Sequence, residues 1–363
     1  MFAEVLKAKS NSLVARFKSV GSLLLMDPLT QASIGAAAAA LVSSSGSVRR
    51  AIFVGAIAGA APDIDVLIRS ETDPMLALEY HRHFTHALIC APVIGLLVAG
   101  LLKGLLFWKK WRYRELALFG IVGALTHGML DACTSYGTLL YLPFSNHRES
   151  WDIISIIDPL FTLPLVLLTA GAFVVRKPAM ARWALFLCGL YFCFGVVQRE
   201  RAQRFAAGLA AERGHLEVTQ LTARPSFGNT LLWRIVYRVE GRYYVDAVQL
   251  MPFEKPKLYA GSSVDAFTVG DRKLLVDDGA LLAYDVERFR FFSQDYLYQY
   301  AKDQNVIGDL RYAMYPNSTQ PLWGLRIDLE HVDEHAEFVY FRDPSAQNFK
   351  RLWDMVLGRD IQN

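Results

Sequence analysis

Charged residues are scarce in this 363-residue chain: they make up 20% of it, below the quarter or so that is typical of soluble proteins. The four cysteines are too few for a disulfide framework in a chain of this length. The 38 basic and 35 acidic residues leave a net charge of only +3, which gives no support to a nucleic-acid partner. Disorder is excluded as well, because 53% of the residues are hydrophobic.

Apolar residues are what the chain has in abundance, with a mean hydropathy of +0.22. The stretch 87–108 has 22 residues interrupted only by the charge of Lys103, enough to cross a bilayer core of about 30 Å. Three further candidate spans and two shorter stretches of small residues, which suit close helix packing, are 115–130, 158–175, 181–197, 31–42 and 51–61. The sequence therefore predicts a membrane-embedded, all-α helical bundle of about four to six spans over residues 26–200.

The composition changes after the last of these stretches. From residue 201 onward, apolar residues alternate with charged ones, and 231–250 predicts two strands joined by a turn at Glu240–Gly241. Two further segments, 293–303 and 346–357, predict helices. A polar segment, QRERAQR, is expected to connect the bundle to this region. The sequence thus predicts a soluble α+β domain over residues 201–363.

Histidine is concentrated in the most apolar part of the chain, where five of the eight lie between residues 81 and 147. They accompany aspartates in three motifs: PDID at 62–65, HRHFTH at 81–86 and HGMLD at 127–131. On a helix, His127 and Asp131 share a face because they are four residues apart. Imidazole nitrogens and carboxylate oxygens are the ligands of zinc, manganese and iron. Taken singly, each motif is more often a capping or hydrogen-bonded pair than a metal site.

The order of the spans strengthens the metal interpretation. If the spans alternate, the three motifs all emerge on one side of the membrane, with Asp63 and Asp65 on an extended turn. The basic groups 49–50, 109–114 and 176–182 emerge on the other side, which the positive-inside rule places in the cytoplasm. We therefore expect the motifs and the C-terminal domain on the outer, periplasmic side.

Two basic segments disagree with this orientation. One is the group of arginines at 199, 201 and 204, after the last predicted span. The other is the segment 1–25, which has the apolar spacing of an amphipathic surface helix. An equally good interpretation of 1–25 is an extension that is not translated, with Met26 as the true start. We give more weight to the three short basic loops.

Five segments between Met26 and Leu168 together resemble one known family: MDPLTQASIGAAAAALV, GAIAGAAPDIDVLI, YHRHFTHALI, GALTHGMLDACTSYGTLLYLPFS and WDIISIIDPLFTLPL. They are similar to the YdjM-like family of bacterial membrane-bound metal-dependent hydrolases. The resemblance implies a helical, multi-pass protein of the inner membrane with a divalent metal site. The family is also distantly similar to the all-α zinc phospholipase C group, which cleaves phosphoesters.

Carried onto this sequence, the family motifs imply a set of site residues. The implied metal ligands are Asp63, Asp65, His86, His127 and Asp131. His81 is a candidate ligand or general acid, and Arg82 is placed to stabilise a phosphate oxygen. Secondary candidates are His83, Thr85, Thr134, Ser135, Tyr136 and Asp158. His83 departs from the family pattern, since it stands where glycine is expected.

These residues lead to the hypothesis of phosphoester hydrolysis by a water that one or two cations activate, with zinc expected first and manganese or iron as alternatives. A site at the membrane surface suggests a lipid or lipid-linked phosphate as the substrate. One alternative is a transporter that passes a cation, but the ligands lie at one lip and no repeated halves are present. Another is an assembly protein that acts through its C-terminal domain, which leaves the histidines unexplained.

Overall fold

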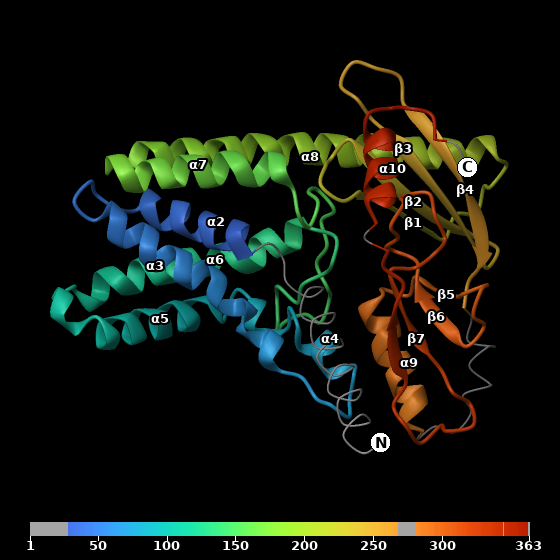
Figure 1. Ribbon diagram of the computed structural model, residues 1–363, viewed down its shortest axis with the longest axis horizontal. Coiled ribbons are helices and arrows are strands. Elements are labelled where there is room, and N and C mark those ends of the chain that lie inside the picture. The colour runs from blue at the N-terminus through green and yellow to red at the C-terminus, as the bar shows by residue number, and fades with distance from the viewer. Residues whose placement is uncertain (1–27, 268–279, 344, 362–363) are drawn as a thin grey trace, which may run out of the picture.

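The computed structural model describes residues 28–267, 280–343 and 345–361, and it joins a bundle of helices to a domain built around two β-sheets (Figure 1). The long helices are α2 (Pro28–Leu41), α3 (Val48–Ala60), α5 (Ala91–Leu105), α6 (Tyr113–Cys133), α7 (Pro159–Val175) and α8 (Pro178–Glu212). Short helical segments between them are η1 (Ala61–Leu67), α4 (Leu76–Tyr80), η2 (Phe84–His86) and η3 (Phe107–Lys109). The helical region and the sheet domain predicted from the sequence are therefore both present.

Among the described residues, two helices, α6 and α8, are long and apolar enough to cross a membrane. A third span results if the segment 76–86 and α5 count as one, although they are bent by 84°. The predicted four to six spans are not confirmed, because α2, α3, α5 and α7 have only 14, 13, 15 and 17 residues. The predicted span 87–108 is shortened because α5 begins only at Ala91, with Pro92 in its first turn.

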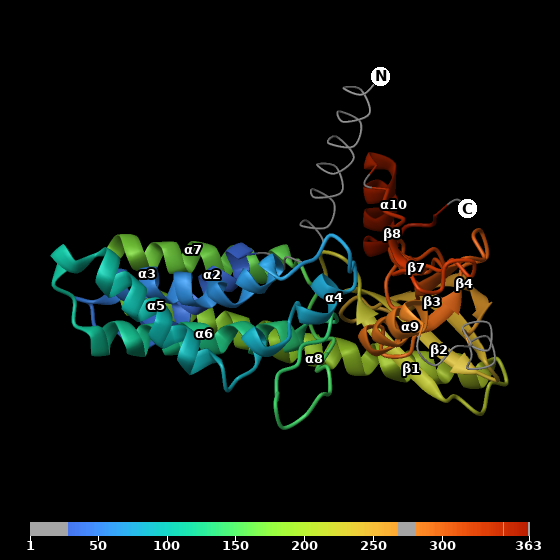
Figure 2. The same cartoon turned by 90° about the horizontal axis from the view of Figure 1, so that it is seen from below.

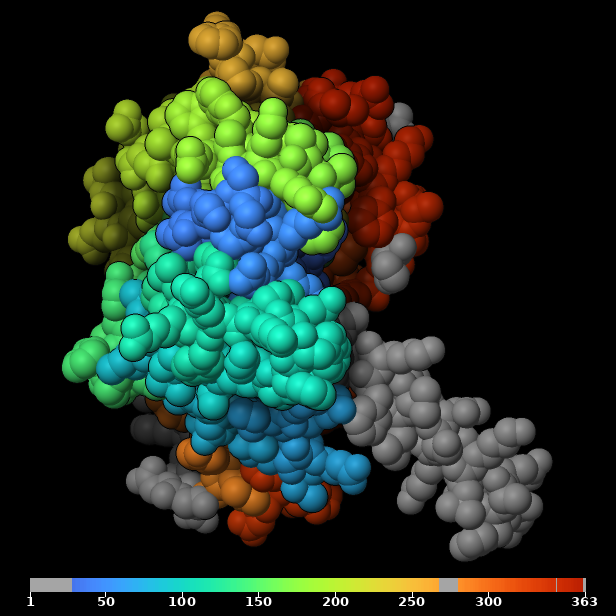
Figure 3. Space-filling model, turned by 90° about the vertical axis from the view of Figure 1, so that its left-hand side faces the viewer, coloured from blue at the N-terminus to red at the C-terminus, as the bar shows by residue number. Residues whose placement is uncertain are grey.

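Small residues allow the helices of the bundle to approach closely, as the composition predicts. A Cβ atom on Gly35 of α2 would lie 2.5 Å from the carbonyl oxygen of Gly55 on α3, and one on Gly123 of α6 would lie 2.7 Å from the same oxygen. Seen end-on, α2 and α3 lie between the pair α7–α8 and the pair α5–α6 (Figure 3). At Gly35, Gly55 and Gly123, the helices α2, α3 and α6 therefore lie so close together that larger side chains would force them apart.

Basic residues collect at the end of the bundle that lies away from the sheet domain (Figure 1). They lie at the turns between α2 and α3, between α5 and α6, and between α7 and α8. Arg49 donates hydrogen bonds to the backbone carbonyls of Phe173 and Val174, and Arg50 pairs with Glu115. The three basic groups that the sequence assigns to one side thus lie at one end of the bundle.

The polar segment QRERAQR is not a separate connector, because it lies within α8, which continues from the bundle onto the sheet domain (Figure 2). Ala202 and Ala206 pack with Trp233 in the hydrophobic core of that domain. Arg201 donates a hydrogen bond to the carbonyl oxygen of Met251 at 3.2 Å. The boundary expected near residue 200 therefore falls inside one continuous helix, and Arg201 lies on that helix and contacts the loop between β3 and β4.

In the described part of the C-terminal domain, the strands form two four-stranded antiparallel sheets, each with its strands in sequence order. The strands are β1 (Gln220–Pro225), β2 (Leu232–Val239), β3 (Arg242–Gln249) and β4 (Lys257–Asp265) in one sheet, and β5 (Leu297–Gln299), β6 (Val306–Asp309), β7 (Trp323–Arg326) and β8 (Glu337–Tyr340) in the other. Two helices accompany them, α9 (Leu281–Phe292) and α10 (Ala346–Val356).

The predictions for this domain are partly confirmed. Glu240 and Gly241 form the expected turn between β2 and β3, and both have the positive φ that a type I′ turn requires. The helix predicted over 346–357 is confirmed as α10. The helix predicted over 293–303 is wrong: α9 ends at Phe292, the next residues include two with positive φ, which a right-handed helix excludes, and the segment then forms β5.

Candidate metal centre

The three acid and histidine motifs meet at the end of the bundle that faces the sheet domain. Asp63 and Asp65 lie on η1, a 3-10 helix rather than the extended turn predicted from the sequence. His86 lies on η2, and His127 and Asp131 lie in the last turns of α6. All five side chains are buried. The structure thus brings together residues that are up to 68 positions apart in the chain (Asp63 to Asp131).

Four donor atoms face one another at the centre of this group: Asp63 Oδ1, His86 Nε2, His127 Nε2 and Asp131 Oδ2, which we call the metal tetrad. The two histidine nitrogens lie 2.9 Å apart. Asp63 Oδ1 lies 3.4 and 3.3 Å from them, and Asp131 Oδ2 lies 3.2 and 3.8 Å from them. Ligands at about 2.0–2.1 Å from a tetrahedral ion are separated by about 3.3 Å. These five separations are therefore close to those between the ligands of a tetrahedral metal ion, and Asp63, His86 and His127 form one of the groups that could hold an ion.

The contacts at Nδ1 allow both imidazoles to present an unprotonated Nε2 atom to a metal ion. His127 Nδ1 lies 2.6 Å from the carbonyl oxygen of Gly59, which only accepts, so Nδ1 carries the proton. His86 Nδ1 lies 3.2 Å from Asp65 Oδ2, and this carboxylate holds its proton in the same way. The two Nε2 atoms lie 2.9 Å apart, close enough for both to bind one cation.

Asp65 contacts the Nδ1 atoms of His81 and His86 and contributes no atom to the tetrad. Its Oδ1 accepts a hydrogen bond from His81 Nδ1 at 2.9 Å. Its Oδ2 accepts from the backbone N–H of Arg82 at 3.1 Å and from Thr85 Oγ1 at 2.8 Å. Burial opposes ionisation of this carboxyl, but the bonds from His81 and His86 outweigh it and lower the pKa of Asp65. Asp65 is thus a charged acceptor that orients two histidines.

Several polar atoms at the centre have no hydrogen-bond partner in the part of the chain that the structure describes. They are both carboxylate oxygens of Asp63 and Nε2 of His81, and all are buried. Buried polar atoms nearly always have a partner, so these atoms point to a missing group. With neutral histidines, the three aspartates and Arg82 leave two negative charges, which one divalent cation would balance.

Asp131 is held by two further side chains. Gln31 Nε2 donates to Oδ1 at 2.7 Å, and Arg82 Nε lies 3.1 Å from Oδ2. Arg82 also donates to Thr134 Oγ1 at 3.2 Å, and its backbone has a φ of +60°, which is strained for this residue type. Arg82 therefore pairs with a ligand candidate instead of facing open space. Sequence reasoning missed Gln31, whose only signal is an amide in an alanine-rich helix.

The other secondary candidates surround the centre without joining the tetrad. The ring of Tyr136 lies 4.7 Å from Arg82 Cζ and 6.0 Å from the ring of His81. The backbone carbonyl of Ser135 accepts a hydrogen bond from Arg224 of the sheet domain at 2.8 Å.

Two candidates lie apart from the centre. His83 is half-buried beside the rings of Tyr80 and Phe84. Asp158 caps α7, where Oδ1 accepts from the backbone N–H groups of Leu160 and Phe161, and Tyr191 donates to Oδ2 at 2.8 Å. The structure thus gives Asp158 a capping role, and none of the metal-capable groups found in the described residues includes either side chain.

A second set of three ligand atoms lies beside the tetrad and shares one residue with it. Asp63, Asp65 and His81 each place an atom within 4.8 Å of the other two, and all three are buried. A close contact of backbones brings α6 next to His86, because a Cβ atom on Gly128 of α6 would lie 2.1 Å from the carbonyl oxygen of His86. The set of Asp63, Asp65 and His81 has the residue types that could hold a second ion.

A third group resembles a metal site but already contains a cation. Asp73, Asp285 and His335 place ligand atoms within 4.8 Å of one another. Arg288 Nη1 lies 2.9 Å from Asp73 and 3.1 Å from Asp285, and Nη2 lies 2.7 Å from Glu79. This group, which we call the Arg288 cluster, joins the helical region to α9 by ion pairs.

Comparison with known proteins relates the helical region to one family of membrane proteins. Residues 26–202 match the model of the YdjM inner membrane protein family. No curated protein and no solved structure gives a significant match. The resemblance stated from the five sequence segments is therefore confirmed, and the match ends within α8. The family and the candidate spans together indicate that this region lies in a lipid bilayer.

Proposed function

We propose that this protein is a membrane-bound, metal-dependent hydrolase that cleaves a phosphoester of a lipid or lipid-linked substrate. The metal tetrad is the observation that carries the proposal, since its two nitrogens lie 2.9 Å apart and each lies 3.2–3.8 Å from the two oxygens. Two imidazoles and two carboxylates suit zinc best, and manganese or iron also accept such ligands. The resemblance to metal-dependent hydrolases supports the same chemistry.

Asp63, His86, His127 and Asp131 would hold the ion, and Asp65, Gly59 and Gln31 would keep the ligands in place. When bound, a divalent cation lowers the pKa of a water molecule and neutralises charge on phosphoryl oxygens. His81 has its Nε2 atom buried and without a partner among the described residues, while Nδ1 is held by Asp65. Its role in the proposal is to carry a proton at Nε2 to or from the reacting group.

We also propose that the protein is a multi-pass protein of the bacterial inner membrane, with the metal centre and the C-terminal domain on the outer side. The basic turns at the far end of the bundle support this orientation, because short cytoplasmic loops carry an excess of lysine and arginine. A lipid or a lipid-linked phosphate would reach a centre at this end from the membrane surface.

The test is the release of a water-soluble product by the full-length protein, purified in uncharged detergent and supplied with zinc or manganese. The product is inorganic phosphate from a phosphomonoester or a diphosphate, and glycerol or glycerol phosphate from a phosphodiester. Phosphatidic acid, phosphatidylglycerol and a polyprenyl diphosphate, each in micelles, are the substrates to compare. We expect release from at least one of them, abolished by a chelator and about 100-fold slower or worse in His127→Ala, because a ligand is lost. His147→Ala is the matched control, since this exposed histidine lies outside the metal centre.

Two outcomes would contradict the proposal. One is full activity in a His127→Ala protein that inserts into membranes normally. The other is no release from any of the three lipids by protein that elemental analysis shows to be loaded with metal.

A further inference from the structure

A cavity of about 480 Å³ lies between the helical region and the C-terminal domain. The helical region contributes Ser135 and Tyr136, which follow α6, and Ile157, which precedes α7. The remaining wall comes mainly from the sheet domain. Tyr136 separates this cavity from the metal centre, because its ring also lies against Arg82, the partner of Asp131.

Four arginines line the cavity, and no carboxylate among the described residues does: the arginines are Arg224, Arg234, Arg311 and Arg342. We call this cavity the arginine pocket. Two of the four are close to acids behind the wall. Arg311 bonds to both oxygens of Asp309 at 2.8–3.2 Å, and Arg224 lies 3.9 Å from Asp152.

The other two arginines bring positive charge that no acid neutralises. Arg234 is buried and donates only to backbone carbonyls, those of Leu310, Pro316 and Ser318. Burial lowers the pKa of Arg234 to about 10, so it remains charged at neutral pH. Arg342 has no hydrogen-bond or ion-pair partner among the residues that the structure describes, and it is exposed at the edge of the pocket.

A buried donor in the wall is also free to bind. Arg311 is 1% exposed, and its Nη1 has no hydrogen-bond partner in the described part of the chain. Arg148 lies close by, stacked at 5.6 Å on the ring of Phe292, and is buried without a carboxylate partner in the same residues. Buried guanidinium groups without counter-charges are costly, so an anion is the ligand that the pocket lacks.

The rim of the pocket is apolar and continues onto the surface of α7. Phe227 and Phe349 line the pocket and are 51% and 40% exposed. Leu160, three residues after Ile157, is 61% exposed and lies at the start of a groove between α7 and α8. An anion in the pocket thus lies beside a surface suited to hydrocarbon.

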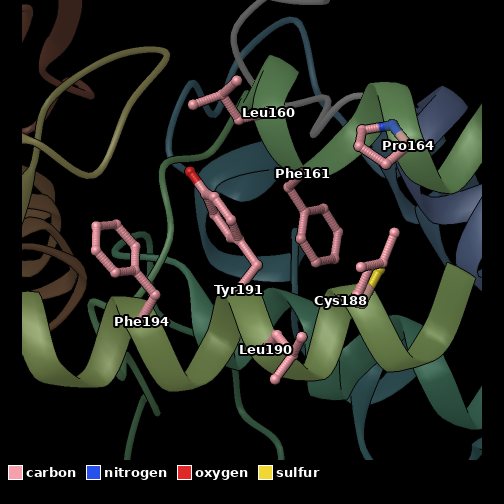
Figure 4. A pocket seen from close by; sticks show the side chains of 8 residues that line it. Leu160, Phe161, Pro164, Cys188, Leu190, Tyr191 and Phe194 are labelled. Atoms are coloured by element: carbon pink, nitrogen blue, oxygen red, sulfur yellow. The ribbon is translucent and has the colours of Figure 1, made fainter. Parts of the chain in front are cut away.

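The groove has a volume of about 310 Å³ and is almost entirely apolar in its lining. Figure 4 shows Phe161 of α7 pointing towards α8 and Tyr191 of α8 pointing back. The hydroxyl of Tyr191 lies 3.2 Å from Thr230 in the loop before β2, next to Phe227. The groove and the pocket are therefore neighbours, with the same loop beside both.

We propose that the arginine pocket binds the phosphate headgroup of an anionic phospholipid, whose acyl chain lies along the groove between α7 and α8. Guanidinium groups bind phosphate oxygens through paired N–H donors, and four of them from one domain give the C-terminal domain a direct part in lipid recognition. The binding does not depend on the metal. That this lipid is also the substrate rests on the proposed hydrolase function.

The test is native mass spectrometry of the full-length protein in uncharged detergent, titrated with phosphatidylglycerol, and in parallel with phosphatidylcholine and with inorganic phosphate. Arg342→Gln removes the unpaired guanidinium, and Ala313→Phe fills the pocket while keeping every charge. We expect phosphatidylglycerol to bind about tenfold more weakly to each variant, because a charge-assisted hydrogen bond or the space for the headgroup is lost. Arg242→Gln is the matched control, since Arg242 is exposed on β3 and pairs with Asp265.

The three ligands and the variants distinguish a phospholipid site from a site for free phosphate and from unspecific lipid binding. Equal affinity of all variants for phosphatidylglycerol, or equal binding of phosphatidylcholine, would overturn the proposal, and so would inorganic phosphate that displaces the lipid at equal concentration. Since Ala313→Phe could misfold, an unchanged affinity in Arg342→Gln alone is sufficient to overturn it. His127→Ala should bind phosphatidylglycerol like the unmodified protein. Lipid that binds in this way but is not hydrolysed would leave the pocket standing and count against the hydrolase.

Discussion

The metal tetrad and the Arg288 cluster both contain aspartates and histidines, yet they differ in what lies at the centre of each cluster. In the tetrad, two imidazole nitrogens and two carboxylate oxygens face one another, and both oxygens of Asp63 lack a hydrogen-bond partner in the described residues. In the Arg288 cluster, the acids surround a guanidinium group. Burial there opposes ionisation of Asp73, but its bond to Arg288 outweighs this and lowers the pKa.

The difference shows that residue types and spacing do not identify a metal site. A cluster of acids and histidines is complete when a basic side chain neutralises it, as in the Arg288 cluster. It lacks a cation when its donor atoms converge and its charge is left over, as in the tetrad. The arginine pocket is the reverse case, since basic groups are left over there and an anion is what it lacks.

The largest expected effect comes from removing a ligand from each cluster in turn. Asp131→Ala should lower metal affinity by more than about 100-fold, because it deletes one of four donors and leaves Arg82 unpaired. Asp73→Asn should leave the metal content unchanged. Elemental analysis of detergent-purified protein gives both numbers, and normal membrane insertion of each variant is the control. Stoichiometric metal in Asp131→Ala, or loss of metal in Asp73→Asn, would contradict the claim that the tetrad binds the metal and the Arg288 cluster does not.

A second prediction removes the cation of the Arg288 cluster. Arg288→Ala should destabilise the protein by about 2 kcal/mol, because it leaves Asp285 buried and Asp73 without its ion pair. The estimate is modest since Glu79 and Asp73 keep some contact with water. A thermal unfolding scan in detergent measures it, with Arg326→Ala, an exposed paired arginine, as the control. Equal melting temperatures would mean that the cluster contributes nothing to joining the two regions.

The fold was predictable where composition and periodicity determine it. The apolar runs predict the helical region, and the Glu240–Gly241 turn follows from local preferences alone. The helix 293–303 was wrong and the apolar helix within 87–108 is shorter than predicted, because the ends of both depend on particular backbone conformations. The segment QRERAQR looked like a connector, since its polar residues gave no sign that alanines between them pack on a sheet.

The sequence predicted which residues converge at the candidate site, but it did not predict what each of them contacts there. The motifs identify the aspartates and histidines that converge. They do not show that Asp65 faces His81 and His86 through its hydrogen bonds, or that Arg82 is taken up by Asp131. Such roles depend on contacts between distant segments, which one sequence does not contain. The arginine pocket was missed for the same reason, because its arginines are spread over more than a hundred positions.

A third prediction sharpens the distinction between a ligand and the residue that orients it. Asp65→Asn keeps the shape of the side chain but removes the charge that fixes the Nδ1 protons of two imidazoles. We expect metal affinity to fall about tenfold, at the lower end of the loss typical of outer partners of metal ligands. Competition with a metal-binding dye measures this affinity. A loss as large as that of Asp131→Ala would make Asp65 a ligand itself, and no loss would remove it from the centre.

The smallest effect is expected at Asp158, the acid that the family resemblance places near the metal and the structure places at a helix end. Asp158→Ala should cost about 1 kcal/mol, the usual price of a lost N-cap, because the backbone N–H groups of Leu160 and Phe161 lose their acceptor. Asp158→Asn should cost less, since an amide oxygen still caps the helix and burial already raises the pKa of this carboxyl. Melting temperatures from thermal unfolding measure both losses of stability, and the larger loss is expected in Asp158→Ala.

Metal content separates this capping role from ligation. It should be the same in Asp158→Ala, in Asp158→Asn and in the unmodified protein, because both carboxylate oxygens are already engaged, one by the start of α7 and the other by Tyr191. Reduced metal in Asp158→Asn, where the cap is kept, would show that this acid reaches the ion despite its hydrogen bonds. The tetrad would then need a fifth residue, and its charge balance would change by one unit.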